Sequence, residues 1–557
     1  MSSLPPGVTT QAPEKLVFPV LQPAQISRIA AHGEKRRLSR GKVLVEQGDQ
    51  NTPFFVVMSG EIEVLRPTCT GEELVAVHRA GQFTGDVNML SGRGSLLRAR
   101  MREDGDVIQL TRQSLQSLVQ TDADLSEILM RAFILRRVEL VNLGYGDALL
   151  IGSTHSPGSL RIKEFLTRNG HPYRYIDLDR DSDVQKVLDH FHVRTEDIPV
   201  VICRGQFVLR NPTNQEVADC LGFNEGIDES QMRDVIVVGA GPAGLAAAVY
   251  AASEGLDVLV VETHAPGGQA GSSSKIENYL GFPTGISGQE LAGRAYTQAQ
   301  KFGADVMIAR SATRLRCDKQ PFGVEIDDGK RLLARTIIIA TGAEYRRLRL
   351  DNLARFEGAG VYYGATLVEA QLCGNDEVIV VGGGNSAGQA AVFLAQTARH
   401  VHILVRAGQL ADTMSRYLIR RIEENGKITL HPRTEVHALE GNGCLQRVEL
   451  RNNETGVLET KEIRHLFLMT GASPNTHWLD GCVSLDEKGF VKTGPDLSSE
   501  DLRAAAWPLP RPPYVFETSR PGVFAVGDVR AGNIKRVASA VGEGSIAIHL
   551  VHQVLRD

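Results

Sequence analysis

The sequence has few cysteines, and none of them is clustered. Its 557 residues contain seven cysteines, no two of which form a Cys-x-x-Cys pair. Zinc and iron–sulfur sites need clustered thiolates, and a disulfide framework usually shows an even number of closely spaced cysteines. We therefore expect buried, inert thiols rather than a metal site or a disulfide scaffold. The cysteines are Cys69, Cys203, Cys220, Cys317, Cys373, Cys444 and Cys482.

Two histidine pairs are the other candidates for metal ligands. They are His190-x-His192 and His549-x-x-His552. Neither pair has a third ligand nearby in the sequence, and a zinc site needs three or four ligands. The sequence therefore predicts no metal.

The chain also lacks an excess of one charge and any long apolar run. Its 61 Lys and Arg and 66 Asp and Glu give a net charge of −5, which offers no bulk attraction for nucleic acid or an anionic membrane. No window approaches the roughly 18 apolar residues of a membrane span, and residues 1–20 lack the basic and apolar regions of a signal peptide. We expect a cytoplasmic protein with no nucleic-acid or membrane partner.

A glycine turn between two apolar strands is the first clear motif. Segment 233–262 reads as a strand, a Gly-x-Gly-x-x-Gly turn that includes Pro242 and Ala243, an Ala-rich helix, and a second strand ending in an acid. Gly239 allows the tight turn, Gly241 lets the backbone approach a pyrophosphate, and Gly244 lets helix and strand pack closely. Glu262 is placed to bind a ribose hydroxyl, so the segment predicts dinucleotide binding.

The same pattern recurs at 377–406. Here Gly382, Gly384 and Ala387 occupy the turn positions, with Asn385 and Ser386 between them. The second strand ends in Arg406 where the first ends in an acid. Because an arginine pairs with a 2′-phosphate and an acid repels it, the first site is interpreted as binding FAD and the second as binding NADPH. The alternative for Arg406 is a solvated strand end.

Three further segments have turns suited to a cofactor. Two strands end in Thr-Gly-Ala, at Thr341-Gly342 and at Thr470-Gly471, where glycine lets the chain pass close to a ligand. In 522–529, Asp528 follows a strand and Gly527, and its carboxylate is suited to bind a polyol hydroxyl.

The order of these segments resembles low-molecular-weight thioredoxin reductases from about residue 233 to 557. The resemblance implies that Gly268, Gln269 and Asn278 contact the flavin, and that Gly527 and Asp528 hold its ribityl and phosphate groups. It also places Lys535-Arg536-Val537 beside the isoalloxazine ring. Arg536 replaces the family's glutamine there, and a cation at that edge would stabilise reduced anionic flavin.

The resemblance also implies a domain architecture. It predicts a split FAD-binding domain at 232–345 and 476–557, with an NADPH-binding domain at 346–475 between the two parts. Both are Rossmann-like α/β domains. The family forms homodimers through the FAD domain, so a homodimer is implied as well.

The active-site thiols of that family are missing. Its Cys-Ala-Thr-Cys corresponds here to residues 364–367, which read Gly-Ala-Thr-Leu. Reduction of a disulfide partner needs two thiols, one to interact with flavin and one to exchange with the partner. Cys373 lies about six residues beyond and is interpreted as structural.

A second pair of thiols is missing upstream. Segments 147–181 and 197–222 resemble the glutaredoxin or thioredoxin fold, which we place at 146–226. The family's Cys-Pro-x-Cys turn is here Ser156-Pro157-Gly158-Ser159, and Pro199 corresponds to its cis-proline. A serine hydroxyl has too high a pKa to act as a thiolate does, so this domain is predicted to be redox-silent.

The N-terminal part, 20–143, has short strands punctuated by glycines and resembles the cyclic-nucleotide-binding β jelly roll. That family's phosphate cassette corresponds to 83–99. Asp86, after Gly85, takes the place of the ribose-binding acid, but Gly94-Ser95 stands where Pro-Arg is expected. Arg93 or Arg98 would have to supply the cation. A cyclic nucleotide is one interpretation, and a scaffold or dimerisation module without a ligand is the other.

We therefore expect a multidomain, NADPH-dependent FAD oxidoreductase whose electrons leave for an acceptor other than a dithiol. A protein carrier, a quinone, another small molecule or oxygen would serve, and the N-terminal domain is a candidate regulator. One alternative is a thioredoxin-disulfide reductase that uses non-standard cysteines. Another is a ligand-sensing flavoprotein with little turnover. The Pro-rich segment 500–517 is interpreted as a surface excursion, with an acceptor-docking loop as the alternative.

Overall fold

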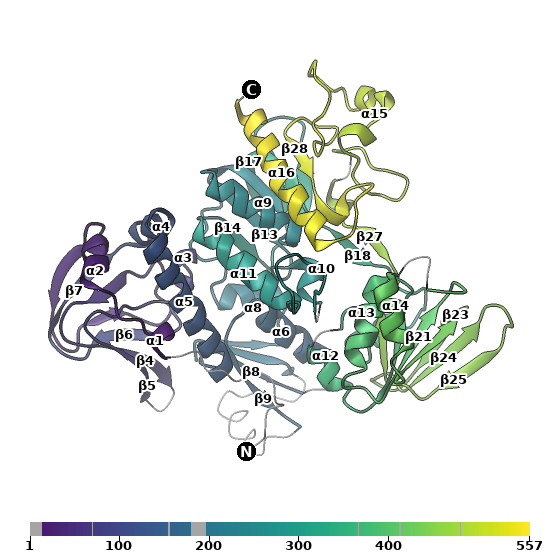
Figure 1. Ribbon diagram of the computed structural model, residues 1–557, viewed down its shortest axis with the longest axis horizontal. Helices are drawn as coiled ribbons and strands as arrows, with labels where there is room; N and C mark the ends of the chain where they lie inside the picture. Colours follow the sequence, from purple (N-terminus) through teal and green to yellow (C-terminus); the bar gives the residue numbers. More distant parts are fainter. Residues whose placement is uncertain are drawn as a thin grey trace.

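The computed structural model describes residues 14–68, 71–153, 156–179, 197–205, 207–273, 275–365, 367–410, 414–479 and 481–556. Figure 1 shows the N-terminal strands at one end of the molecule and the strands of the second glycine turn at the other. A central sheet with helices α9, α11 and α16 lies between them. Among the described residues, no helix combines the length and apolar character that a membrane crossing requires.

The N-terminal part is built from antiparallel strands, as the sequence predicted. One sheet has the order β1-β7-β3 and the other β2-β6-β4-β5. Phe55, Val57, Ile62 and Met101 form a core with residues from both sheets. Phe54, Phe83 and Phe133, whose rings meet edge-on or tilted, form a second core together with residues of the helices. The elements are β1 (Glu34–Leu38), β2 (Val43–Val45), β3 (Phe54–Val57), β4 (Ile62–Thr68), β5 (Gly71–His78), β6 (Arg98–Met101), β7 (Gly105–Leu110), and helices α1 (Glu14–Val17), α2 (Pro23–Ala30), α3 (Asn88–Ser91), α4 (Arg112–Thr121) and α5 (Ala123–Leu143).

A four-stranded sheet follows, in the order β11-β10-β8-β9. Strands β8 and β9 are parallel, while β10 pairs antiparallel with both β8 and β11. The Ile198-Pro199 peptide bond is cis, in agreement with the expectation for Pro199. The glutaredoxin-like assignment itself stays a prediction. The elements are β8 (Ala148–Gly152), α6 (Pro157–Arg168), β9 (Tyr173–Asp177), β10 (Val200–Cys203), β11 (Phe207–Arg210) and α8 (Asn214–Cys220).

The central sheet contains the first glycine turn. Strands β14, β13, β12, β17 and β28 run parallel, and β16 and β15 extend the sheet antiparallel. Because β28 comes from the far end of the chain, this sheet joins two separate stretches of sequence. The elements are β12 (Met232–Val238), α9 (Pro242–Ser253), β13 (Val258–Glu262), α10 (Gly268–Gly271), α11 (Gly288–Lys301), β14 (Asp305–Ile308), β15 (Ala312–Arg316), β16 (Phe322–Ile326), β17 (Arg331–Ile339), β28 (Val523–Ala525), η5 (Gly527–Val529) and α16 (Val537–Arg556).

A second parallel sheet contains the second glycine turn, in the order β19-β26-β20-β21-β22. A short pair, β18 and β27, joins it to the central sheet, and strands β23, β24 and β25 form an antiparallel flap. The elements are β18 (Ala343–Tyr345), η2 (Leu353–Arg355), β19 (Val361–Tyr362), α12 (Leu367–Leu372), β20 (Glu377–Val381), α13 (Asn385–Leu394), β21 (His400–Val405), α14 (Arg416–Glu423), β22 (Ile428–Pro432), β23 (Thr434–Glu440), β24 (Arg447–Asn452), β25 (Leu458–Lys461), β26 (His465–Leu468), β27 (Ala472–Pro474) and η3 (His477–Leu479).

The expectation of inert thiols is wrong for two cysteines. Cys317 and Cys482 form a disulfide across 165 residues of sequence. No sequence spacing indicated this pairing, because Cys317 follows β15 whereas Cys482 lies in the C-terminal stretch that contributes β28 to the same sheet. Of the remaining cysteines, Cys203 and Cys373 are buried as expected, but Cys444 is exposed. Cys220 is half-buried, and Cys69 lies outside the described residues.

The Pro-rich segment begins with helix α15 (Ser499–Ala504). The end of the segment is fixed by Glu517. This residue is fully buried and accepts hydrogen bonds from Arg511, at 2.6 Å, and from the backbone N–H of Tyr514, at 2.9 Å. The Arg511 guanidinium also lies over the Tyr514 ring at 3.9 Å. The segment is therefore held by its own ion pair.

Candidate active site

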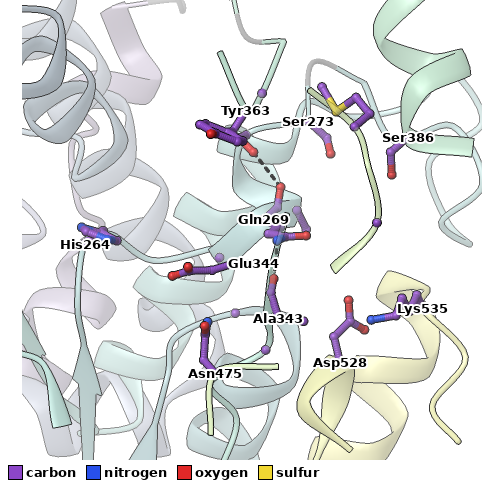
Figure 2. A pocket seen from close by; sticks show the side chains of 18 of the residues that line it. His264, Gln269, Ser273, Ala343, Glu344, Tyr363, Ser386, Asn475, Asp528 and Lys535 are labelled. Atoms are coloured by element: carbon purple, nitrogen blue, oxygen red, sulfur yellow. Dashed lines mark hydrogen bonds between the residues drawn. The ribbon is translucent and has the colours of Figure 1, made fainter. Parts of the chain in front are cut away.

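One cavity of about 1780 Å³ contains both glycine turns. A pocket for one small ligand usually has about 300–1,000 Å³, so this cavity has room for more than one. All the residues predicted for FAD and NADPH line the cavity, except Gly244 and Ala387. Figure 2 shows Gln269, Asn475, Asp528 and Lys535 around it, contributed by three separate stretches of the chain.

The first turn has the geometry that the sequence predicted. Gly239 has φ +104°, and a Cβ there would lie 2.3 Å from the Ala340 carbonyl oxygen. A Cβ on Gly244 would lie 1.9 Å from the Gly239 oxygen, which explains why Gly244 packs against the turn and does not line the cavity. At Gly241 the nearest neighbouring atom would be 4.0 Å away, leaving open space where a pyrophosphate would approach.

Glu262 ends β13 with its carboxylate at the cavity wall. Its side chain is 8% exposed and accepts hydrogen bonds from the N–H groups of Ala240, at 2.7 Å, and His264, at 2.9 Å. These bonds fix the carboxylate in position. Because each carboxylate oxygen can accept more than one hydrogen bond, it retains the capacity to bind a ribose hydroxyl.

Asp528 and Lys535 lie next to each other at another part of the wall (Figure 2). Burial raises the pKa of the Asp528 carboxyl, and the charge of Lys535 opposes the rise. The preceding Gly527 donates its N–H to the Glu543 carboxylate at 2.7 Å, which holds the turn against α16. These groups offer one acceptor and one cation to a polar, phosphate-bearing ligand. Arg536 and Val537 line the same stretch.

The second turn repeats the first. Gly382 has φ +142°, and a Cβ there would lie 2.3 Å from the Met469 carbonyl oxygen. Gly384 is the N-cap of α13, and Ala387 is fully buried behind it. Arg406 is exposed at the end of β21, and no carboxylate in the described ranges pairs with its side chain. The guanidinium is therefore available to a phosphate.

The position of the missing thiols borders the same cavity. A Cβ on Gly364 would lie 3.6 Å from the Ser272 Cβ, close to Gln269 of helix α10. Gln269 in turn donates its side-chain N–H to the Ala343 carbonyl oxygen. Thr366 lies outside the described residues. Cys373 is 0% exposed, and burial raises the pKa of its thiol.

Sequence reasoning missed that helix α6 forms part of the cavity wall. Pro157, Gly158, Leu160, Arg161, Glu164 and Arg168 all line it. Four of these, at 157, 161, 164 and 168, follow the three-to-four-residue spacing of one helix face, which was the available signal. Arg168 donates to the Gly268 carbonyl oxygen at 2.8 Å. Pro157 and Gly158, at the start of α6, therefore line the same cavity as Gly364.

The residues of the N-terminal cassette contact other parts of the chain. Arg93 is 9% exposed and lies over the rings of Phe223, at 4.7 Å, and Tyr296, at 5.6 Å. Asp86 lies 3.6 Å from the Arg137 guanidinium. Gly85, with φ +106°, gives its carbonyl oxygen to Arg136, and Arg98 pairs with Glu46 and Glu72. The cyclic-nucleotide role of these residues stays a prediction.

The histidine pairs do not form a metal site in the described part of the chain. His549 contacts Gln553 at 3.2 Å, and His552 pairs with Glu254 at 2.8 Å. His190 and His192 lie outside the described residues. Within those residues, no three His, Cys, Asp or Glu side chains group in a way that could hold a metal ion.

Comparison with known proteins gives two family matches. Residues 233–544 match the pyridine nucleotide-disulphide oxidoreductase model, and residues 35–122 match the cyclic nucleotide-binding domain model. The first match covers more than half of the chain and includes both glycine turns.

Individual relatives agree with the first match. NADPH-dependent thioredoxin reductase 3 of Arabidopsis thaliana is 33% identical over 62% of this chain, and the chain covers 64% of that protein, a little under two thirds. Thioredoxin reductase of Bacillus subtilis is 31% identical over 59% of this chain and 97% of its own length. The crystal structure of T. acidophilum thioredoxin reductase aligns with a TM-score of 0.52 and 28% identity, covering 59% of this chain and all of that one.

The two turns, the parallel sheets around them and these matches lead to one assignment. The chain belongs to the pyridine nucleotide-disulphide oxidoreductase family and is a flavin oxidoreductase of thioredoxin reductase type, with FAD and NADPH as its cofactors.

Proposed function

We propose that this protein uses NADPH to reduce an acceptor that is not a dithiol. The observation that carries the proposal is the segment Gly364–Leu367, where the family's thiols are replaced by residues without sulfur. The next cysteine along the chain, Cys373, is fully buried with a raised thiol pKa, so it is a poor nucleophile.

The described residues fit the two cofactors. Gly241, Glu262 and Asp528 offer an open backbone approach, a ribose acceptor and a polyol acceptor to FAD. Arg406, which pairs with no carboxylate among the described residues, offers its guanidinium to a 2′-phosphate, and this favours NADPH over NADH. Bound FAD would supply hydride acceptance from NADPH and onward electron transfer.

The disulfide-reductase alternative has less support. It needs two thiols that reach the cavity, and no cysteine is among the described residues that line it. The disulfide Cys317–Cys482 is buried in the same core cluster as Trp478. We therefore keep the non-dithiol acceptor as the proposed function.

A regulatory role for the N-terminal domain is the second proposal. Its contacts reach helix α11 of the flavin half, because Arg93 lies over Tyr296 and Gln120 donates to the Lys301 carbonyl oxygen at 3.3 Å. A ligand that changed the cassette would therefore act directly on α11. The homodimer and the cytoplasmic location also remain proposals.

The experiment is an anaerobic titration of the flavin-loaded protein with NADPH, followed by acceptors one at a time. We expect NADPH to bleach the flavin absorbance and thioredoxin to leave it bleached, whereas a non-dithiol acceptor restores it. A flavin that NADPH does not bleach would favour the ligand-sensing alternative. Rapid restoration by thioredoxin alone would contradict the proposal.

A further inference from the structure

We propose that Cys203 and Cys220 form a redox-active dithiol, which hydrogen peroxide oxidises to a reversible disulfide. This inference goes beyond the proposed function and holds for any acceptor that the flavin reduces. Neither cysteine is among the described residues that line the cavity, so the pair lies outside the path from NADPH to the flavin. It is also distinct from the disulfide Cys317–Cys482 of the central sheet.

The two thiols meet at one edge of the four-stranded sheet. Cys203 is the last residue of β10, and Cys220, the last residue of α8, packs against the core that contains Cys203. The two sulfur atoms share a hydrogen bond. The chain after each cysteine shows the same proximity, because a Cβ on Gly222 would lie 2.7 Å from the Arg204 guanidinium. Two elements that are separate in the sequence therefore place their thiols in contact.

This edge of the sheet is far from the turn that lacks thiols. Cys203 pairs with Ala148, the first residue of β8. A Cβ on Gly158, in the turn without thiols, would lie 2.9 Å from the ring of Pro199, which precedes β10. The turn and the dithiol therefore lie at opposite ends of β10. The pair is a site of its own and does not replace the missing Cys-Pro-x-Cys turn.

The surroundings make the two thiols unequal. Cys203 is 0% exposed, whereas Cys220 is half-buried. The hydrogen bond from Cys203 lowers the pKa of the Cys220 thiol, and the charge of Arg204 adds to the lowering, while burial and Asp147 oppose it. The same hydrogen bond, together with burial, raises the pKa of the Cys203 thiol. Cys220 is therefore the thiolate of the pair, and Cys203 keeps its proton.

These roles suit an oxidation in two steps. The Cys220 thiolate attacks one peroxide oxygen, the O–O bond breaks, and the sulfur becomes a sulfenic acid while the leaving hydroxide takes up a proton to form water. The Cys203 sulfur then attacks the sulfenic sulfur, loses its proton and displaces a second water. The balance is 2 Cys–SH + H₂O₂ → Cys–S–S–Cys + 2 H₂O, in which the thiols lose two electrons and the peroxide gains them.

The stretch around Cys220 is bonded to the flavin half of the chain. Asp219 accepts a hydrogen bond from Arg310 at 2.6 Å. The Asn224 side chain exchanges two hydrogen bonds with the backbone of Ile308, the last residue of β14, at 2.7 and 2.8 Å. An S–S bond is about 2 Å long, so Cys220 must move toward β10 when the disulfide forms. Oxidation should therefore alter these contacts with β14.

The test maps the cysteines of the full-length, flavin-loaded protein before and after treatment with hydrogen peroxide. Free thiols are alkylated, and the peptides are separated without reduction and identified by mass spectrometry. We expect a linked peptide that contains Cys203 and Cys220, lighter by two hydrogens than the two thiol peptides together, and its loss after dithiothreitol. Before oxidation, alkylation of the native protein at neutral pH should be about tenfold or more faster at Cys220 than at Cys203.

Variants assign the two roles. Cys203→Ser should leave Cys220 as a sulfenic acid that dimedone traps, because no second thiol is there to displace water from it. Cys220→Ser should leave Cys203 unmodified. The matched controls are Cys373→Ser, at another fully buried cysteine, and Cys444→Ser, at an exposed one, and both should form the disulfide as the wild type does.

Hydrogen exchange of residues 305–310 gives a second readout. We expect the exchange to change when peroxide oxidises the wild type and to stay the same in Cys220→Ser. Unchanged exchange after complete oxidation of the wild type would overturn the coupling to β14.

Peptide mapping of the wild type needs no variant, so the inference is still tested if a variant does not fold. It is overturned if peroxide that oxidises the exposed Cys444 yields no peptide linking Cys203 to Cys220, or if Cys220 is linked to a different cysteine. Because the readout is the state of the thiols, these results are independent of the flavin absorbance that tests the proposed function.

Discussion

The two glycine turns and the N-terminal cassette each lie in a segment that matches a family model, but the residues expected to bind ligands have different surroundings in the two places. In the turns, a Cβ on Gly241 would have no neighbour nearer than 4.0 Å, and Arg406 is exposed at the cavity. In the cassette, Arg93 is buried between two rings and Asp86 faces Arg137. The turn residues therefore line a cavity, whereas Arg93 of the cassette contacts two rings outside the N-terminal part and Asp86 contacts an arginine within it.

The largest expected effect comes from adding a methyl group to the first turn. Gly239→Ala would place its Cβ against the Ala340 carbonyl oxygen at a positive φ, and we expect loss of bound flavin and destabilisation by more than about 3 kcal/mol. Gly255→Ala is the control, because Gly255 also has a positive φ but open space, and should cost about 1–2 kcal/mol. Flavin content and urea unfolding measure both. Equal losses of flavin and stability in the two variants would show that the backbone at Gly239 does not closely approach Ala340.

Removal of the strand-end arginine tests the second turn. Arg406→Ala should raise the KM for NADPH by about 10- to 100-fold and change the KM for NADH little, because a charge-assisted contact contributes about 1.5–3 kcal/mol. Arg399→Ala, beside the start of the same strand, is the matched control. An unchanged preference for NADPH would show that Arg406 is only a solvated strand end.

In the cassette, removal of an arginine should reduce stability and leave ligand binding unchanged. Arg93→Ala removes a buried cation from two aromatic rings, and we expect about 2 kcal/mol of lost stability without any change in cyclic-nucleotide binding. The exposed Arg79→Ala should cost less than about 1 kcal/mol. Calorimetry with cyclic AMP and denaturant unfolding provide the two readouts. Tight cyclic AMP binding that is lost in Arg93→Ala would remove the contrast between the cassette and the turns.

The smallest expected effect is a pH dependence that comes from His171, which lies within the electrostatic influence of Arg93 and Arg137. Burial lowers the pKa of the His171 imidazole, and Arg137 and Arg93 add to the lowering while Asp147 opposes it. Neutral His171 therefore favours the folded state fully above its ordinary pKa of about 6.5, and this contribution is lost as the pH falls. When the pH falls from 7.5 to 5.5, the free energy of unfolding should decrease by about 1 kcal/mol less in His171→Gln than in the wild type. Parallel pH profiles would contradict this.

The sequence predicted the features that depend on local patterns. Both glycine turns were found because strand, turn, helix and terminal residue are contiguous, and their predicted roles for Gly239, Gly244 and Gly382 agree with the close contacts observed. A local strand and glycine turn indicated Asp528, but only the family resemblance supplied Gln269 and related both residues to the same cofactor.

Features that depend on distant segments were missed. The disulfide joins Cys317 to Cys482 across the inserted sheet, so no spacing rule could detect it. The helical spacing of the α6 residues could be recognised in the sequence. Their place at the cavity could not, because Arg168 of α6 contacts Gly268, which is a hundred residues away. The contacts of Arg93 likewise depend on Phe223 and Tyr296, which the cassette motif does not include.

The most direct test of the central claim is stopped-flow spectroscopy of NADPH reduction in the wild type and in Cys373→Ser. A cysteine thiolate beside oxidised flavin gives a long-wavelength charge-transfer band, and we expect no such thiolate band in either protein, with equal rates of bleaching and equal turnover with a non-dithiol acceptor. A long-wavelength band in the wild type that disappears in Cys373→Ser would contradict the claim that electrons leave without a dithiol.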